Sequence, residues 1–366
     1  MPAPVEQILA STTERFAIRL EPVISAFHSL VMLAKADHYS GLGDWIVRTA
    51  ATMSPAERER HRLVMDAFFY AVAPRRSWPA FVAYVDHLAQ EPAVALRDRA
   101  LNHYCSLPRL DGRDEPPPAP AEILRSRESY LAFLEQRFET DKIDLGLESQ
   151  AYGLLTDPAA MQTLVVSHLR HMWTAYLAGE WAAIRPMLQD AVEAFRALDY
   201  DPDDRAAIFE TITNRSLDEI GWAEKILAAE QLIFIPSAHI GPYVGMMPLE
   251  GGLAMLFGAR LPEGVSSGAP DLSRAEILVR LNALADDTRL RILRLVSTTG
   301  ELRSQDIMER LELSQSAASR HLSQLTASGY LMARRCEGAK CYRLSADRIE
   351  DTLQAVRAYL GSGGAV

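Results

Sequence analysis

Apolar residues recur at intervals of three and four along most of the first 260 residues, which is the spacing of amphipathic helices. A charged, Pro-rich stretch over 111–120, DGRDEPPPAP, interrupts the pattern and predicts either an exposed loop or a linker between two helical lobes. The region is therefore expected to be mainly α-helical. The spacing predicts helices over residues 16–35, 57–72, 78–90, 123–139, 159–179 and 181–198.

The pattern changes after this helical region, where short apolar runs alternate with breaks. LIFIP occupies 232–236, and similar runs over 243–247 and 253–257 are separated by Gly-Pro and Gly-Gly pairs. Runs of this kind predict a small β-hairpin or a three-stranded patch near 231–258. The sequence that follows is rich in Gly, Ser and Pro, and it predicts a linker over 263–270.

The pattern over residues 271–366 predicts a different order of helices and strands from that of the preceding region. Apolar spacing predicts helices over 273–285, 287–297, 304–311, 315–328 and 346–360, and two β-runs over 330–335 and 340–344 flank a Gly-containing turn. This is the order of a winged helix-turn-helix. The predicted fold is mainly α: a large helical N-terminal domain over 1–262 with a small β element, and a C-terminal winged helix-turn-helix over 271–366. We expect the apolar residues of its second and last helices to be buried, namely Leu290, Ile292, Leu293, Val296, Ile349, Leu353, Val356 and Leu360.

Charge is distributed unevenly between the two regions. The whole chain has a formal net charge of −10, from 38 basic and 48 acidic residues. Residues 271–366 hold 14 of the basic and 12 of the acidic residues, so this module carries +2 and the remainder carries −12. A mildly basic module behind an acidic body is consistent with nucleic-acid contact at one end.

The helix predicted over 315–328 has an apolar back and a front of small polar and basic residues. A major groove admits one α-helix, whose N-terminal residues reach the base edges, and cations on a hairpin suit the phosphate backbone or the minor groove. The alternative is that these are solvated charges on a module that binds protein. The candidate DNA-binding residues are Ser314, Gln315, Ser316, Ser319, Arg320, His321 and Gln324 on the helix and Arg334, Arg335, Lys340 and Arg343 on the hairpin.

Two stretches of this module resemble a known family. LADDTRLRIL over 284–293 is similar to the LADxTRLRIL signature of ArsR-type (arsenic-repressor-like) regulators, and LSQSAASRHL over 313–322 resembles the recognition helix of that family. The resemblance implies a homodimer, paired through the first and last helices of the module, that binds a roughly palindromic operator in double-stranded DNA, as a repressor does. IPSA over 235–238, with the helical body before it, is similar to an uncharacterised domain fused upstream of such modules.

The sequence departs from the family where the family binds metals. Many ArsR-type repressors hold metals through cysteines of the third helix, in a stretch ELCVCDL. Here the matching stretch is ELRSQDI over 301–307, with Arg303 and Ser304 at the thiolate positions, and the last helix contains no His. Because these metals require thiolate and imidazole ligands, we expect no metal site and no cofactor.

Two pairs of residues suggest further chemistry. Cys336 and Cys341 flank the wing turn, and directly opposed strand residues place their Cβ atoms ~4.5–5.5 Å apart. A redox pair that stiffens the wing is one hypothesis, and two small apolar residues packing under the wing is the other. His168 and His171 lie three residues apart on a helix, but no third metal ligand is identifiable, so a polar stripe is the default interpretation.

These observations predict a dimeric DNA-binding transcriptional regulator. Three cysteines are too few for a disulfide framework, no apolar run is long enough to span a membrane, and neither a signal peptide nor a catalytic motif is recognisable, so we expect a cytoplasmic protein that is not an enzyme. The N-terminal domain is expected to sense a signal, such as an apolar or aromatic small-molecule effector, or to support assembly. The alternatives are an enzyme or a protein-interaction scaffold fused to a winged helix.

Overall fold

The computed structural model describes residues 15–361 apart from 40–41, 114, 140–142, 218–219, 242, 260–261, 263–271, 273 and 337–338. The expected linker over 263–270 therefore lies outside the described residues. The chain forms two compact units. One combines Met1–Leu20, Gln189–Pro236 and Pro242–Val366, and the other combines Glu21–Leu188 and Ser237–Gly241.

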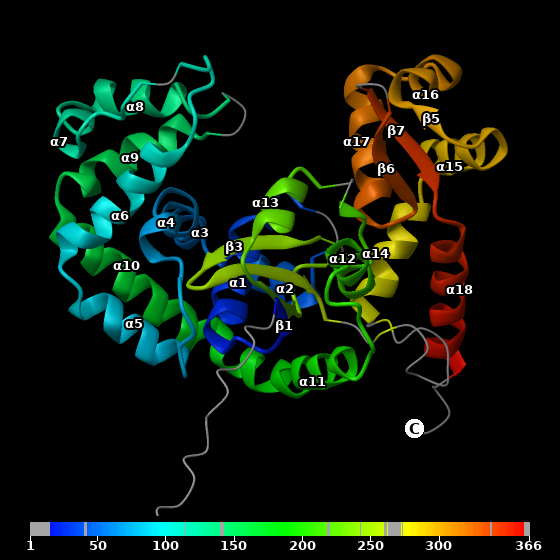
Figure 1. The fold of residues 1–366 in the computed structure, drawn as a ribbon, viewed down its shortest axis with the longest axis horizontal. Helices are drawn as coiled ribbons and strands as arrows, with labels where there is room; N and C mark the ends of the chain where they lie inside the picture. The colour runs from blue at the N-terminus through cyan, green and yellow to red at the C-terminus, as the bar shows by residue number, and fades with distance from the viewer. Residues whose placement is uncertain are drawn as a thin grey trace, which may run out of the picture. The chain divides into compact units, whose positions relative to one another are not determined.

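The second unit is built from helices, which confirms the prediction of a mainly α fold. Its core contains large buried side chains such as Phe27, Phe68 and Tyr130, and α10 packs against α5 and α6 (Figure 1). The helices are α1 (Pro22–Ala34), α2 (Asp44–Thr52), α3 (Pro55–Arg62), α4 (Phe69–Val72), α5 (Phe81–Gln90), α6 (Ala93–Ser106), α7 (Pro120–Ile123), α8 (Arg127–Glu135), α9 (Leu145–Leu155), α10 (Pro158–Met172) and the start of α11 (Ala178–Arg196), with π-helical turns η1 (Leu63–Ala67) and η2 (Trp173–Leu177).

Local signals explain where several of these helices begin. Ser54 and Glu57 form a capping box at the start of α3, where Pro55 takes the first helical position. Asp157 accepts a hydrogen bond from the backbone of Ala160 at the start of α10. The helix expected over 16–35 is wrong at its first residues, because α1 begins at Pro22 and the residues before it form a strand.

That strand completes a four-stranded sheet in the first unit. The strands are β1 (Phe16–Ile18), β2 (Leu232–Ser237), β3 (Gly245–Leu249) and β4 (Gly252–Gly258), in the spatial order β1-β2-β4-β3. β3 and β4 form the expected antiparallel hairpin, and β1 adds to β2 in parallel. Phe234 and Phe257 of this sheet share a buried cluster with Phe195 of α11 and Phe209 of α12 (Arg205–Thr213); α13 (Ala223–Ala228) precedes β2.

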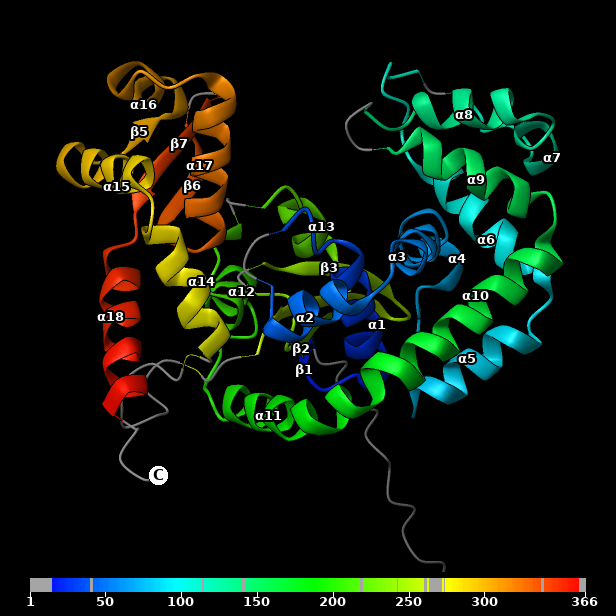
Figure 2. The ribbon, with the colours of Figure 1, turned by 180° about the vertical axis from the view of Figure 1, so that it is seen from behind.

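The winged helix-turn-helix follows in the same unit. Its elements are α14 (Arg274–Leu284), α15 (Asp287–Thr299), β5 (Leu302–Arg303), α16 (Ser304–Leu311), α17 (Gln315–Ala327), β6 (Leu331–Cys336), β7 (Ala339–Leu344) and α18 (Ala346–Gly361). The three strands have the order β5-β7-β6, and α14 packs beside α18 (Figure 2). Asp286 caps α15, Ser314 caps α17, and Gly329 has the left-handed φ of +81° that lets the chain turn from α17 into the wing. Every element expected here is present, and β5 was not expected.

Three leucines of the module that were expected to be buried are exposed. Ile292, Leu293 and Val296 are buried, but Leu290 is 49% exposed, and Leu353 and Leu360 of α18 are 42% and 73% exposed. Helical spacing therefore marked an apolar stripe without distinguishing a core from a surface. No helix within the described part of the chain combines the length and the apolar character required to cross a membrane.

Candidate nucleic-acid interface

Helix α17 presents a polar face to solvent at its N-terminal end. The side chains of Gln315, Ser316, Ser319 and Arg320 are exposed, and those of Ala318, Leu322 and Leu325 form the apolar back of the helix in the module core. The Ser314 hydroxyl accepts a hydrogen bond from the backbone of Ala317 at 3.3 Å, so this residue ends the preceding turn and starts the helix. An exposed polar helix of this kind has the dimensions and chemistry to enter a major groove.

Two other candidate residues of α17 face the protein. The side-chain oxygen of Gln324 accepts a hydrogen bond from Nη1 of Arg289 at 3.0 Å. His321 is largely covered, and its Nδ1 lies 3.7 Å from Oδ1 of Asp286. Both contacts lead to the N-terminal end of α15, so these two side chains orient α17 on its neighbour.

Arg289 links the helices of the module, and pattern reasoning did not single it out. Its buried guanidinium donates to the carbonyl oxygens of Ala283 at 2.6 Å and Asn282 at 2.7 Å, in addition to Gln324. One side chain thereby joins the C-terminal end of α14, the start of α15 and the C-terminal part of α17. The signal lay in the LADDTRLRIL stretch, where an arginine follows the helix cap, but its three partners are set by tertiary packing.

The wing places its basic residues on two paired strands. Arg335 is opposite Lys340 and Met332 is opposite Arg343, and the side chains of Lys340 and Arg343 are exposed. The side chains of Arg334, Arg335 and Cys336 lie outside what the structure describes, so only their backbone positions are known. The register brings all four candidate cations onto one hairpin of the module that also carries α17.

The register corrects the expectation that the two wing cysteines oppose each other. Cys336 pairs with Ala339, and Cys341 pairs with Arg334. The cysteines occupy diagonal positions, for which backbone separations of roughly 7–8 Å are typical, beyond the usual span of a disulfide. Cys341 is buried and is not part of a disulfide. Redox activity of this pair stays an untested hypothesis, and it would require movement of the hairpin.

A second arginine contacts the far end of the recognition helix. Arg215, which follows α12, donates from Nη1 to the carbonyl oxygen of Thr326 at 3.0 Å and from Nη2 to that of Ala327 at 3.2 Å. A cation at a helix C-terminus is favourable because the last carbonyl groups lack intrahelical partners. The sequence carried no recognisable signal for this contact, because it joins segments more than a hundred residues apart.

The two histidines considered as metal ligands do not converge. His168 is buried with His61, whose Nδ1 lies 2.9 Å from His168 Nε2, and His171 is half exposed beside Glu57. His61 Nε2 donates to the Leu30 carbonyl oxygen, so its Nδ1 accepts from His168. Burial lowers the pKa of His61 to about 4 and that of His168 to about 3, so the pair is neutral at physiological pH. The described residues contain no group of three or more His, Cys, Asp or Glu side chains that could hold a metal ion.

A helix-turn-helix with an exposed recognition helix and a basic two-stranded wing defines the class of the C-terminal module as a winged-helix DNA-binding domain. Residues 286–332 match the family model described as bacterial regulatory protein, arsR family. This match lies within the C-terminal module, and the family model does not cover the large N-terminal region.

Two curated relatives match part of the chain. The arsenic resistance transcriptional regulator ArsR1 of Pseudomonas putida is 49% identical over 61 residues, which are 17% of this chain and 48% of that protein. The arsenical resistance operon repressor of Escherichia coli is 47% identical over 62 residues, 17% of this chain and 53% of that protein. The chain thus spans about half the length of the curated relatives it matches.

Solved structures also resemble this region. HlyU from Vibrio cholerae is 34% identical, and the match covers 24% of this chain and 94% of HlyU with a TM-score of 0.20. NolR from Sinorhizobium fredii is 33% identical, and the match covers 26% of this chain and 97% of NolR with a TM-score of 0.19.

Proposed function

We propose that this protein is a DNA-binding transcriptional regulator, acting as a repressor, that reads an operator with α17 and contacts the phosphate backbone with its wing. The observation that carries the proposal is the exposed N-terminal face of α17, with Gln315, Ser316, Ser319 and Arg320, on a module that also carries the basic wing. Base contacts specify a sequence, and phosphate contacts position the protein. The N-terminal region then senses a signal or supports assembly.

The active form in this proposal is a homodimer paired through α14 and α18. These helices pack on each other within one chain, yet Leu278 of α14 and Leu353, Tyr359 and Leu360 of α18 are between 42% and 73% exposed. A second copy of the same two helices would bury these side chains, as the resemblance to ArsR-type regulators implies. A roughly palindromic operator follows from the two-fold symmetry of such a dimer.

A mobility-shift assay across a range of salt concentrations tests the proposal on the DNA upstream of the protein's own gene. Affinity should fall steeply as salt rises, because phosphate contacts release counterions. Residues 271–366 alone should bind more weakly than the full chain, provided that the N-terminal region helps to hold the dimer. Absence of a shift with any upstream fragment would contradict the regulator and favour a protein-interaction scaffold.

Variants separate base reading from phosphate contact. Arg320→Ala and Gln315→Ala should each reduce discrimination between operator and random DNA by about 1–3 kcal/mol. Lys340→Ala and Arg335→Ala should instead weaken both affinities about equally. Arg48→Ala, which removes an exposed arginine of α2 in the helical unit, is the matched control and should change neither. An unchanged affinity ratio for Arg320→Ala would show that α17 does not read bases in this orientation.

A further inference from the structure

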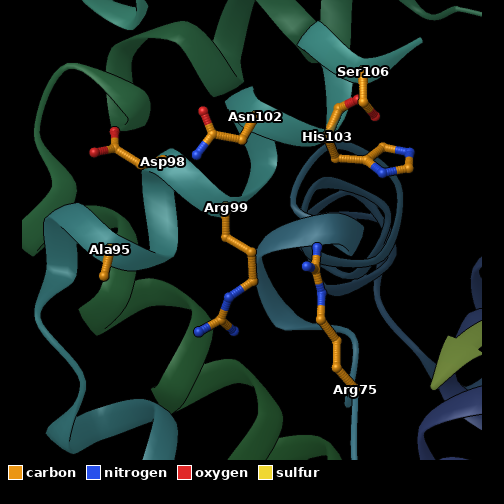
Figure 3. A pocket seen from close by; sticks show the side chains of 7 residues that line it. All are labelled: Arg75, Ala95, Asp98, Arg99, Asn102, His103 and Ser106. Atoms are coloured by element: carbon orange, nitrogen blue, oxygen red, sulfur yellow. The ribbon is translucent and has the colours of Figure 1, made fainter. Parts of the chain in front are cut away.

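The helical unit contains a hollow of about 630 Å³ with a cationic lining (Figure 3). One wall is a single face of α6, where Ala95, Arg99, Asn102 and Ser106 recur at three- and four-residue spacing. Arg75 enters from the segment that follows α4. The volume lies within the range of roughly 300–1,000 Å³ that is usual for pockets that hold small molecules. The lining is polar and charged, and so does not suit the apolar or aromatic effector expected from the sequence.

The positive charge in this hollow is not fully balanced by the protein. Asp98 is engaged by its neighbour Arg97 at 2.8 Å, and Arg99 pairs with Glu91 and donates to the Ala71 carbonyl oxygen at 2.9 Å. Arg75, in contrast, is exposed, and its guanidinium has no hydrogen-bond or ion-pair partner among the residues that the structure describes. Burial lowers the pKa of Arg75, the charge of the nearby Arg99 lowers it further, and Tyr84 opposes the shift.

The wall beside the two arginines carries aromatic rings and hydrogen-bonding groups. The imidazole of His103 stacks on Tyr70, with ring centroids 3.5 Å apart, and Tyr70 in turn contacts Tyr104 edge to face. Figure 3 shows that the side chains of Arg75 and Arg99 both extend into the hollow, with Asn102 and His103 at its α6 side. A guanidinium fork matches the two oxygens of a carboxylate or phosphate, and side-chain amides and hydroxyls can bind the remainder of a ligand.

We propose that this hollow is a binding site for a small molecule that carries a carboxylate or phosphate group, held by Arg75 and Arg99, with Asn102 binding its polar remainder. If the N-terminal region is the sensor, a role that rests on the proposed function, the bound anion is the signal. The ligand then acts on DNA affinity only as far as it binds one conformation of the protein better than the other.

Calorimetric titration of the full-length protein without DNA tests the site. The probes are phenyl phosphate and benzoate, with benzamide as the neutral control of similar shape. At least one anion should bind saturably, more weakly at high salt, and the stronger of the two identifies phosphate or carboxylate as the preferred group. Arg75→Gln should weaken that binding at least tenfold. Arg76→Gln, which removes the neighbouring arginine that stacks on Trp78 at 4.3 Å, should leave it unchanged.

Arg75 is the informative position because it holds no part of the fold, whereas Arg99 bridges Glu91 and the Ala71 carbonyl and its replacement endangers folding. Absence of saturable binding of both anions up to millimolar concentration would overturn the proposal. Equal binding of benzamide, or anion binding that Arg75→Gln leaves unchanged, would also overturn it. Since this titration contains no DNA and the mobility shift contains no anion probe, failure of the site and failure of the regulator are separate results.

Discussion

Replacement of Arg289 should destabilise the winged helix more than replacement of any exposed arginine of the same helix. Arg289→Met keeps the length of the side chain and removes the donors that hold Asn282, Ala283 and Gln324. The two carbonyl oxygens belong to the C-terminal end of α14, where that of Asn282 also accepts a hydrogen bond from the backbone N–H of Ala285 at 3.2 Å. The change therefore disconnects α14 and α17 from the start of α15.

The magnitude follows from the number of bonds lost. A hydrogen bond that involves a charged group contributes about 1.5–3 kcal/mol, and three are removed. Arg289 is 8% exposed, so the variant also removes the free-energy cost of desolvating its guanidinium, which offsets part of this loss. We expect a net loss of about 3 kcal/mol in the free energy of unfolding of the module, which is roughly a hundredfold in its opening equilibrium.

Hydrogen exchange followed by mass spectrometry measures this loss in the full chain. Tryptophan fluorescence is unsuitable, because all five tryptophans precede the module, the last being Trp222. Peptides from α15 and α17 should exchange about a hundredfold faster in Arg289→Met under conditions in which exchange requires opening of the module. Arg291→Met, at an exposed arginine of the same helix, is the control. A difference between the two variants below about 1 kcal/mol would refute the assignment of Arg289 as the link among the three helices.

Three further predictions concern pH and metals. Burial raises the pKa of Glu148 to about 7, above its unfolded value of 4.5, so the stabilising contribution of this carboxyl group is lost as pH rises through 7. Glu148→Gln should therefore raise the free energy of unfolding on the order of 2 kcal/mol at pH 8 and much less at pH 5. Urea titration measures this difference. The pKa values of His61 and His168 are lowered to about 4 and about 3, so the neutral pair stabilises the helical unit at pH values above the unfolded pKa of 6.5. This contribution is lost as pH falls from 6.5 towards 4, and tryptophan fluorescence should show the loss. An unchanged pH profile of unfolding in His168→Gln would contradict its origin in the pair. Zinc, cadmium or arsenite at one equivalent should leave the protein–DNA complex intact in a mobility shift, because the thiolate and imidazole positions of the family hold other residues; release that Cys336→Ser with Cys341→Ser abolished would identify the wing as a metal sensor.

The winged helix-turn-helix was readable from the sequence because its signals are local. Helix caps such as Asp286 and Ser314, a glycine that tolerates a left-handed φ at Gly329, and the apolar spacing of α15 to α17 all act within a few residues of one another. The polar front of α17 and the cations of the wing follow from the same periodicities. Local chemistry therefore predicted the class of module and its candidate reading residues.

Contacts between distant segments were decided only by the tertiary structure. The pairing of β1 with β2 joins residues more than two hundred positions apart, and no local pattern distinguishes that short strand from the start of a helix. Helical spacing likewise marked Leu353 as apolar without showing that its side chain is exposed. The convergence of Arg75 with Arg99 on one hollow depends on how α6 packs beside the segment after α4. Periodicity reports the face on which a side chain lies, whereas its partner depends on which other element packs there.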